Sequence, residues 1–276
     1  MRDRAAIDAY TKDRSTYRRL AKRFRVSVGT AFNRVQRALK KKPSLIERTK
    51  RHLKDCDGVL VLDGKLIRIQ GKLFTCFVAW DRGFKKPIHF LLKEGGEKEL
   101  WYWRLLVDLE RLRYRPKGFV SDGIISLKES LADRYPDLPH QRCTVHIFLA
   151  ARSKVIYGKK IDARSRAFVD QLKDILWAKT LTGAKRIFKK IWNTKGLTRR
   201  EQIALKFIYP TLPECFVCRD PKFKHLKLPR SSNAIENVMG NIEVRLKTMR
   251  GTKSRLAAEA LINEILLQVS SQVINQ

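Results

Sequence analysis

Three acidic side chains stand where they could hold metal ions. Asp63 ends an apolar run (59–62, VLVL), Asp122 follows another (118–120, GFV), and Glu236 lies far along the chain. Two-metal phosphoryl transfer needs carboxylates that converge on ions about 3.5–4 Å apart. Mg²⁺ suits such a site because it binds few protein carboxylates and keeps water and phosphate oxygens as further ligands. The pattern therefore indicates a nuclease-type site.

Each acid also has a purely structural explanation. Asp63 precedes Gly64, which is a good hairpin signal, and Asp122 precedes a helix that it could cap. Glu236 stands at the third position of a helix whose cap would be Asn233. Two acids at the ends of neighbouring strands favour the joint, metal-binding interpretation. Glu243, two turns after Glu236, is the fallback, and Asp81 and Asp108 are reserves expected to be a solvated turn residue and a helix-face residue.

The cysteines and histidines offer a weaker metal hypothesis. Cys143 and His146 supply two ligands, which do not make a zinc site. Cys215-x-x-Cys218 with His225 has a spacing that zinc allows, although a fourth ligand is unclear, and small buried thiols are the favoured explanation. Five cysteines in a chain of 276 residues form no disulfide framework.

The charge balance points to a polyanionic partner. Sixty Lys and Arg against 27 Asp and Glu give a formal net charge of +33. Such a surface repels itself unless a polyanion neutralises it, and nucleic acid is the usual one. The alternative is a ribosomal or generic basic protein. No window approaches eighteen consecutive apolar residues and no signal peptide opens the chain, so we expect a soluble, intracellular protein.

The first forty residues predict a helix-turn-helix. One helix has Leu20, Ala21 and Phe24 on one face, and a second, capped by Ser27, has Ala31, Val35 and Leu39 inward. Arg25 stands in the turn where Gly usually takes the left-handed conformation, at a cost of about 1 kcal/mol. An ordinary helical hairpin is the alternative.

The remaining elements follow from the period of the apolar residues. Residues 40–43 (KKKP) predict a solvated linker. The helix at 98–113 has an apolar series expected to face inward, namely Leu100, Trp103, Leu106, Leu109 and Leu112. Strands are expected at 59–63, 73–80, 87–92, 118–121 and 138–143, and helices at 124–135, throughout 144–212, at 233–250 and at 253–273, with a break at Gly251.

Three strands, a helix, a strand, a helix and a strand are the order of a ribonuclease-H-like α/β core with a mixed sheet. We therefore expect a helix-turn-helix domain over 1–43 and the first part of the core over 57–143. An all-helical insertion would cover 144–230, and C-terminal helices completing the core 231–276.

With Ser121-Asp122-Gly123, Gln141-Arg142-Cys143-x-x-His146 and Ser232-Asn233-x-x-Glu236 in hand, the chain resembles the mutator-like (IS256-type) group of prokaryotic insertion-sequence transposases. The resemblance covers roughly residues 59–251. It implies that Asp63, Asp122 and Glu236 are the catalytic and metal-binding acids, and that Cys143 and His146 support them. The basic residues after Glu236 are Arg245, Lys247 and Arg250. The chain is short for the group and opens almost directly with the helix-turn-helix, so a truncated copy is one expectation.

The resemblance also implies a reaction and its partners. Two Mg²⁺ or Mn²⁺ ions would serve DNA cleavage and then direct strand transfer by the freed 3′-hydroxyl. The partners are double-stranded DNA (terminal inverted repeats and target), with a homodimer or larger assembly on DNA in the prokaryotic cytoplasm and no membrane. Trp177 and Trp192 are expected mainly to pack in the core, and base stacking is the less favoured interpretation. The alternatives are an inactive or recruited DNA-binding protein, a structure-specific nuclease and an RNA-binding protein. The residues expected nearest the groove are Ser27, Gly29, Thr30, Asn33 and Arg34.

Overall fold

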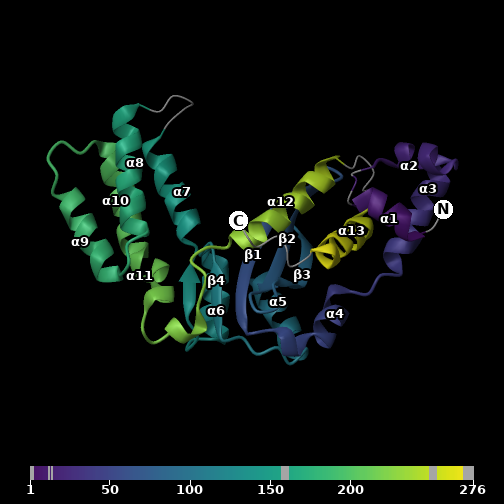
Figure 1. Cartoon of the computed structure of the whole chain (residues 1–276), viewed down its shortest axis with the longest axis horizontal. Helices are drawn as coiled ribbons and strands as arrows, with labels where there is room; N and C mark the ends of the chain where they lie inside the picture. The colour runs from purple at the N-terminus through teal and green to yellow at the C-terminus, as the bar shows by residue number, and fades with distance from the viewer. Residues whose placement is uncertain (1–2, 12, 14, 157–161, 249–253, 270–276) are drawn as a thin grey trace. The chain divides into compact units, whose positions relative to one another are not determined.

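The computed structural model (Figure 1) describes residues 3–11, 13, 15–156, 162–248 and 254–269. Its strands are β1 (Val59–Ile69), β2 (Lys72–Asp81), β3 (Lys86–Glu94), β4 (Gly118–Ser121) and β5 (His140–Arg142). Its α-helices are α1 (Asp3–Thr11), α2 (Tyr17–Phe24), α3 (Val28–Lys40), α4 (Leu45–Arg51), α5 (Glu99–Arg111), α6 (Ile125–Arg134), α7 (Thr144–Val155), α8 (Ala163–Leu176), α9 (Leu181–Trp192), α10 (Arg199–Ile208), α11 (Leu212–Cys215), α12 (Asn233–Thr248) and α13 (Arg255–Gln268). Short 3-10 turns cover Leu53–Asp55, Tyr209–Thr211, Val217–Arg219 and Lys224–Leu226.

The sheet has five strands in the order β3-β2-β1-β4-β5. β2 and β3 are antiparallel, whereas β4 is parallel to both β1 and β5. This mixed sheet, with helices between its later strands, is the ribonuclease-H-like α/β fold that the sequence predicts. The chain divides into two compact units: unit 1 is 1–58, 62–115 and 233–276, and unit 2 is 59–61 and 116–232.

In unit 1, α2 and α3 are joined by a tight turn, as predicted. The side-chain oxygens of Thr16 and Ser27 cap the two helices. Arg25 takes the left-handed conformation, with φ 50° and ψ 50°. Leu20, Ala31 and Val35 are fully buried between the helices. We call residues 16–40 the α2–α3 unit.

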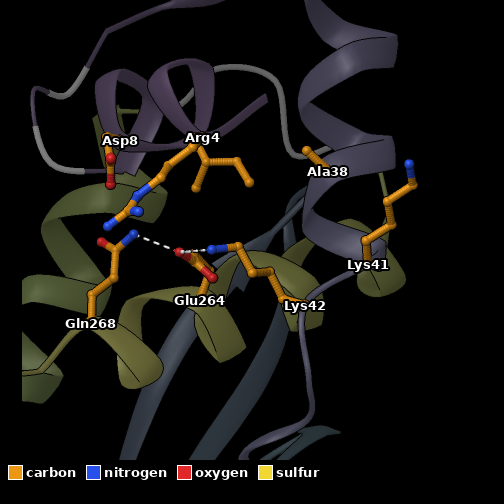
Figure 2. A pocket seen from close by; sticks show the side chains of 8 residues that line it. Arg4, Asp8, Ala38, Lys41, Lys42, Glu264 and Gln268 are labelled. Atoms are coloured by element: carbon orange, nitrogen blue, oxygen red, sulfur yellow. Dashed lines mark hydrogen bonds and ion pairs between the residues drawn. The ribbon is translucent and has the colours of Figure 1, made fainter. Parts of the chain in front are cut away.

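The segment after α3 is exposed at Lys41 and Pro43, as expected of a solvated linker, but its backbone is also held in place by α13. The Asn263 side chain of α13 grips it from both sides: Leu45 N donates to Oδ1 at 2.8 Å, and Nδ2 donates to Pro43 O at 3.0 Å. Lys42 reaches the buried carboxylate of Glu264 at 3.3 Å, as Figure 2 shows. An unpredicted helix, α4, begins directly afterwards. α13 therefore ties the α2–α3 unit to the rest of unit 1.

Helix α5 packs on β2 and β3 of unit 1 through a different face from the one expected. Tyr102 and Leu105 are buried, together with the predicted Leu106 and Leu109. Leu100 is 57% exposed and Trp103 38% exposed. The sequence of α5 is apolar on most of its circumference, so spacing alone selected a stripe that overlaps the buried face at Leu106 and Leu109 but is rotated away from it at Leu100 and Trp103.

Unit 2 contains a helical core of its own. α7, α8, α9, α10 and α11 enclose a cluster of buried apolar side chains that includes Ile147, Leu172 and Leu205. Helical pattern throughout 144–212 was predicted from the absence of strand signals, and it is confirmed for the described part of that range. The expected break at Gly251 lies outside the described residues.

Asn263→Ala should free the chain between α3 and α4. It leaves Leu45 N and Pro43 O without their partner, at a cost of about 1–3 kcal/mol in unfolding free energy. Trypsin should then cut after Lys40 or Lys41 in the folded protein, where the wild type resists. Asn193→Ala, at an exposed position of unit 2, is the matched control. Equal resistance of all three proteins would contradict the clamp.

Candidate active site

Asp63 lies inside a strand rather than at its end, because β1 continues to Ile69. The hairpin turn falls at Gln70 and Gly71, between β1 and β2, so the alternative of a turn at Asp63-Gly64 is wrong. Asp63 is only 9% exposed. Burial raises the pKa of the neighbouring Cys76 thiol to about 12, and the charge of Asp63 adds to the effect.

The two residues after Asp63 show which sides of the sheet the helices of unit 1 cover. A Cβ on Gly64 would lie 2.7 Å from the Tyr102 hydroxyl and 2.8 Å from Glu97, beside α5. Lys65 instead forms an ion pair with Glu243 of α12, at 3.1 Å. Side chains alternate along a strand, so Asp63 points to the same side as Lys65, the side of α12.

That ion pair gives Glu243 a structural partner within unit 1. Glu236 lies in the first turn of α12, which begins at Asn233, and two helical turns before Glu243. It therefore occupies the same face of α12. Glu97, an acid that the sequence did not single out, lies against Gly64, on the side of β1 opposite to Asp63. Its carboxylate accepts a hydrogen bond from the Tyr102 hydroxyl at 2.7 Å.

Asp81 is buried, not the solvated turn residue that was expected. Its carboxylate accepts hydrogen bonds from Gly58 N at 3.2 Å, Phe84 N at 2.7 Å and the Tyr114 hydroxyl at 2.6 Å. Burial raises the pKa of Asp81 despite these bonds. These donors give Asp81 a structural role, because its carboxylate bridges the chain before β1 and the chain after β2. We therefore no longer consider it a candidate catalytic residue. Asp108 lies on α5, as expected, in ion pairs that include Arg104 at 3.1 Å.

In unit 2, the Ser121-Asp122-Gly123 segment forms a hydrogen-bonded turn after β4. Ser121 Oγ lies 2.7 Å from His140 Nε2 and accepts from Gly123 N at 3.1 Å. Asp122 Oδ1 accepts from Ile124 N at 3.1 Å, which leaves its second oxygen outside this turn bond. Asp122 is half-buried. The segment thus fixes the backbone on both sides of the acid.

The strand pairing relates the first two acids to the sheet. The pairs in register between β1 and β4 are Val59 with Gly118, Leu60 with Phe119 and Val61 with Val120. Asp63 and Asp122 each follow the last of these pairs by two residues.

Arg142 locks the turn that carries Asp122. Its Nε donates to Asp122 O at 3.1 Å, and its guanidinium bonds Glu214 at 3.1 Å. Glu214 also receives Lys128 Nζ at 2.6 Å. Burial raises the pKa of Glu214, but the two cations outweigh it and hold the pKa below its ordinary value. Gly123 takes φ +81° against Arg142, where a Cβ would lie 2.4 Å from Nε.

Gln141 has a role that the sequence did not reveal. Its buried amide donates to Cys215 O at 2.9 Å, and its oxygen accepts from Cys218 N at 2.8 Å. The Cys-x-x-Cys segment is therefore held through its backbone. Among the described residues, Cys215, Cys218 and His225 do not come together as a group of metal ligands, and burial raises the pKa of the Cys215 thiol to about 12.

Cys143 and His146 are held by the residue that precedes α12. Ser232 N donates to Cys143 Sγ at 3.3 Å, and Ser232 Oγ lies 3.4 Å from His146 Nδ1. Burial raises the pKa of the Cys143 thiol, but hydrogen bonds from His146 and Ser232 outweigh it and leave the pKa below its ordinary value. These contacts fix the chain four residues before Glu236.

The residues predicted to bind DNA occupy mixed environments. Ser27, Gly29 and Asn33 are exposed, whereas Thr30 and Arg34 are half-buried. Arg245 is buried at 4% exposure. The Lys247 side chain and the whole of Arg250 lie outside the described residues.

The two tryptophans of the helical part are partly packed. Trp177 meets Phe148 edge-on, with ring centroids 5.4 Å apart, and Trp192 stacks on Phe188 at 5.9 Å. Each is 38% exposed.

No protein-family model matches the chain, and no curated protein does. Among solved structures it resembles the Mos1 strand transfer complex, with a TM-score of 0.26 and 16% identity over 78% of this chain and 75% of that chain. It also resembles a simian T-cell lymphotropic virus intasome in complex with PP2A regulatory subunit B56 gamma, with a TM-score of 0.25 and 11% identity over 72% of this chain and 66% of that chain. The TM-score to the Mos1 mariner transposase catalytic domain is 0.22, with 18% identity over 62% of this chain and 83% of that chain. No helix of the described ranges is long and apolar enough to cross a membrane.

Gly123→Ala should destabilise unit 2 by more than its backbone conformation requires. Gly196 has nearly the same φ, +80°, but open space around it. Gly196→Ala therefore measures the conformational penalty alone, about 1 kcal/mol. Gly123→Ala should cost about 1–3 kcal/mol more in urea unfolding, because the methyl group displaces Arg142. Equal losses for the two variants would show that the Arg142 side chain moves away from a Cβ at position 123 without a cost in stability.

The stability of the protein should fall in mild acid through His140. Burial lowers the pKa of His140 to about 4, against an ordinary 6.5. The unfolded chain therefore takes up the proton first, and stability is lost as pH falls from about 6.5 towards 4, by up to about 3 kcal/mol. Denaturant titrations across this range should show a smaller loss in His140→Gln, whereas replacement of the exposed His225 should leave the wild-type slope. A slope unchanged in His140→Gln would refute the assignment.

Proposed function

We propose that this chain is a metal-dependent DNA transposase of the insertion-sequence type. It would cut DNA at the ends of its element and join the freed 3′-hydroxyl to target DNA. The observation that carries the proposal is the pattern of acids on a ribonuclease-H-like sheet. Asp63 belongs to the central strand, and Asp122 follows the neighbouring parallel strand at the equivalent register position.

The third acid of the proposed site is Glu236. Its helix, α12, lies on the side of β1 to which Asp63 points, as the Lys65–Glu243 ion pair requires. The competing candidate, Glu243, is engaged in that ion pair. Glu236 also directly follows the segment that Cys143 and His146 hold through Ser232. Support of this kind suits Cys143 and His146 as positioning residues.

The donor set fits two Mg²⁺ or Mn²⁺ ions, which Asp63, Asp122 and Glu236 would hold. All three offer hard carboxylate oxygens, the ligands that Mg²⁺ prefers. When bound, the ions supply Lewis-acid activation of the attacking oxygen and stabilisation of the leaving oxygen.

The chain's own residues would provide position and charge. The turn bond from Ile124 N and the lock by Arg142 orient the Asp122 carboxylate. In both steps one bond from phosphorus to a 3′-oxygen breaks as one bond to water or to the incoming 3′-hydroxyl forms. No redox partner is needed. The net charge of +33 would neutralise DNA phosphates.

Recognition of terminal inverted repeats would fall to the α2–α3 unit, through the exposed start of α3. Its contact residues would be Ser27, Gly29, Thr30, Asn33 and Arg34. A homodimer or larger assembly on DNA would bring two ends together, in a prokaryotic cytoplasm at the nucleoid.

Asp63→Asn, Asp122→Asn and Glu236→Gln should each abolish Mg²⁺-dependent cleavage of a duplex carrying the gene's own flanking sequence. DNA binding should stay near the wild-type level, because each change removes one carboxylate charge and keeps its shape. Glu243→Gln is the matched control and should still cut. If Glu236→Gln cut and Glu243→Gln did not, the third assignment would be wrong. Binding without cutting by the wild type would indicate a DNA-binding protein derived from a transposase.

A further inference from the structure

The surface beside the start of α4 forms a basic hollow in unit 1. It has a volume of about 650 Å³ and gathers four cations around a single acid. Its lining residues are Lys41, Lys42, Pro43, Glu47, Lys50 and Arg51.

Two of these charges are already used inside the protein. Lys42 reaches Glu264 at 3.3 Å, and Figure 2 shows it turned towards that carboxylate while Lys41 points away. The carboxylate of Glu47 accepts from Ser44 N at 2.6 Å and Ser44 Oγ at 3.0 Å in a capping box. These bonds lower the pKa of Glu47. Lys41, Lys50 and Arg51 remain exposed, and we call these three the basic ridge.

The ridge stands on a rigid base. Thr49 Oγ1 donates to Ile88 O at 2.7 Å, and Arg48 donates to Leu267 O at 3.1 Å and to Pro87 O at 2.6 Å. The Asn263 clamp fixes the chain just before α4. The buried side of α4 is therefore fastened to β3 and α13, which leaves Lys50 and Arg51 projecting from a fixed helix. A fixed base lowers the ordering cost of binding a ligand there.

The ridge continues the exposed face of α3. Asn33, Arg37 and Lys40 recur at helical spacing on one face of that helix, and all three are exposed. Lys41 follows directly at the C-terminal end of α3. One row of polar and basic side chains thus runs from the start of α3 to the hollow.

We propose that the basic ridge binds backbone phosphates of the same DNA duplex that the α2–α3 unit contacts. The inference rests on the part of the proposed function that has the chain bind duplex DNA, and not on cleavage. Lys and Arg contacts to phosphates position a protein on DNA without reading its sequence. The ridge therefore supplies affinity and orientation beside the residues that contact bases.

The test compares two triple variants of the full chain, each losing two lysines and one arginine at exposed positions of described residues. The ridge variant is Lys41→Gln/Lys50→Gln/Arg51→Gln, and the control variant is Lys98→Gln/Arg115→Gln/Lys117→Gln. Affinity is measured from 50 to 200 mM salt, for a duplex of the gene's flanking sequence, an unrelated duplex and a single strand of equal length. Unfolding curves of both variants check that each still folds.

The ridge variant should bind both duplexes about tenfold or more weakly than the control, and the slope of log affinity against log salt should flatten by roughly three. A slope equal to that of the control would overturn the proposal. So would a loss confined to the single strand, or wild-type protein that binds no duplex. Wild type that binds through the ridge yet never cuts would leave this inference standing and refute the proposed enzyme.

Discussion

A carboxylate inside the central strand of the sheet constrains much of the structure around it. β1 has hydrogen-bonded neighbours on both edges, and Asp63 is almost completely buried in it. Burying a carboxylate costs roughly several kcal/mol of folding free energy unless a charge or hydrogen bonds compensate. The next two positions follow the same alternation: Gly64 admits Glu97 and Tyr102 on one side, and Lys65 binds α12 through Glu243 on the other. Gly64 and Lys65 thus meet different neighbours, residues beside α5 for Gly64 and Glu243 of α12 for Lys65.

The residues around β5 work as a scaffold rather than as separate chemical groups. Gln141 holds the backbone at Cys215 and Cys218, Arg142 holds the turn after β4, and Cys143 receives Ser232 N. Three consecutive side chains therefore reach three different segments of unit 2. Gln141 and Cys143 bond to backbone groups of other segments, and Arg142 bonds both the Asp122 carbonyl and the Glu214 carboxylate.

The acids of the chain are largely engaged in internal bonds. Glu214 binds Arg142 and Lys128, Glu201 binds Arg164 at 2.9 Å, and Glu264 binds Lys42. Since acids are few relative to Lys and Arg, this internal use leaves surfaces such as the ridge with net positive charge. The excess of Lys and Arg and the internal use of the acids therefore act together. It keeps the fold compact while it leaves cations facing solvent.

The sequence by itself determined where the five strands begin, approximately, and the α2–α3 unit, because apolar period and capping residues are local signals. The sequence also placed Asp63 and Asp122 in neighbouring strands, whereas their register came from the pairing of β1 with β4. Only the tertiary structure decided the rest. The face that α5 buries depended on which neighbours it met, since its apolar residues surround most of the helix. Asp63 lies mid-strand because β1 continues beyond its apolar run through pairing with β2. The Asn263 clamp and the bonds of Gln141 join residues far apart in the chain, and no local pattern encodes such partners.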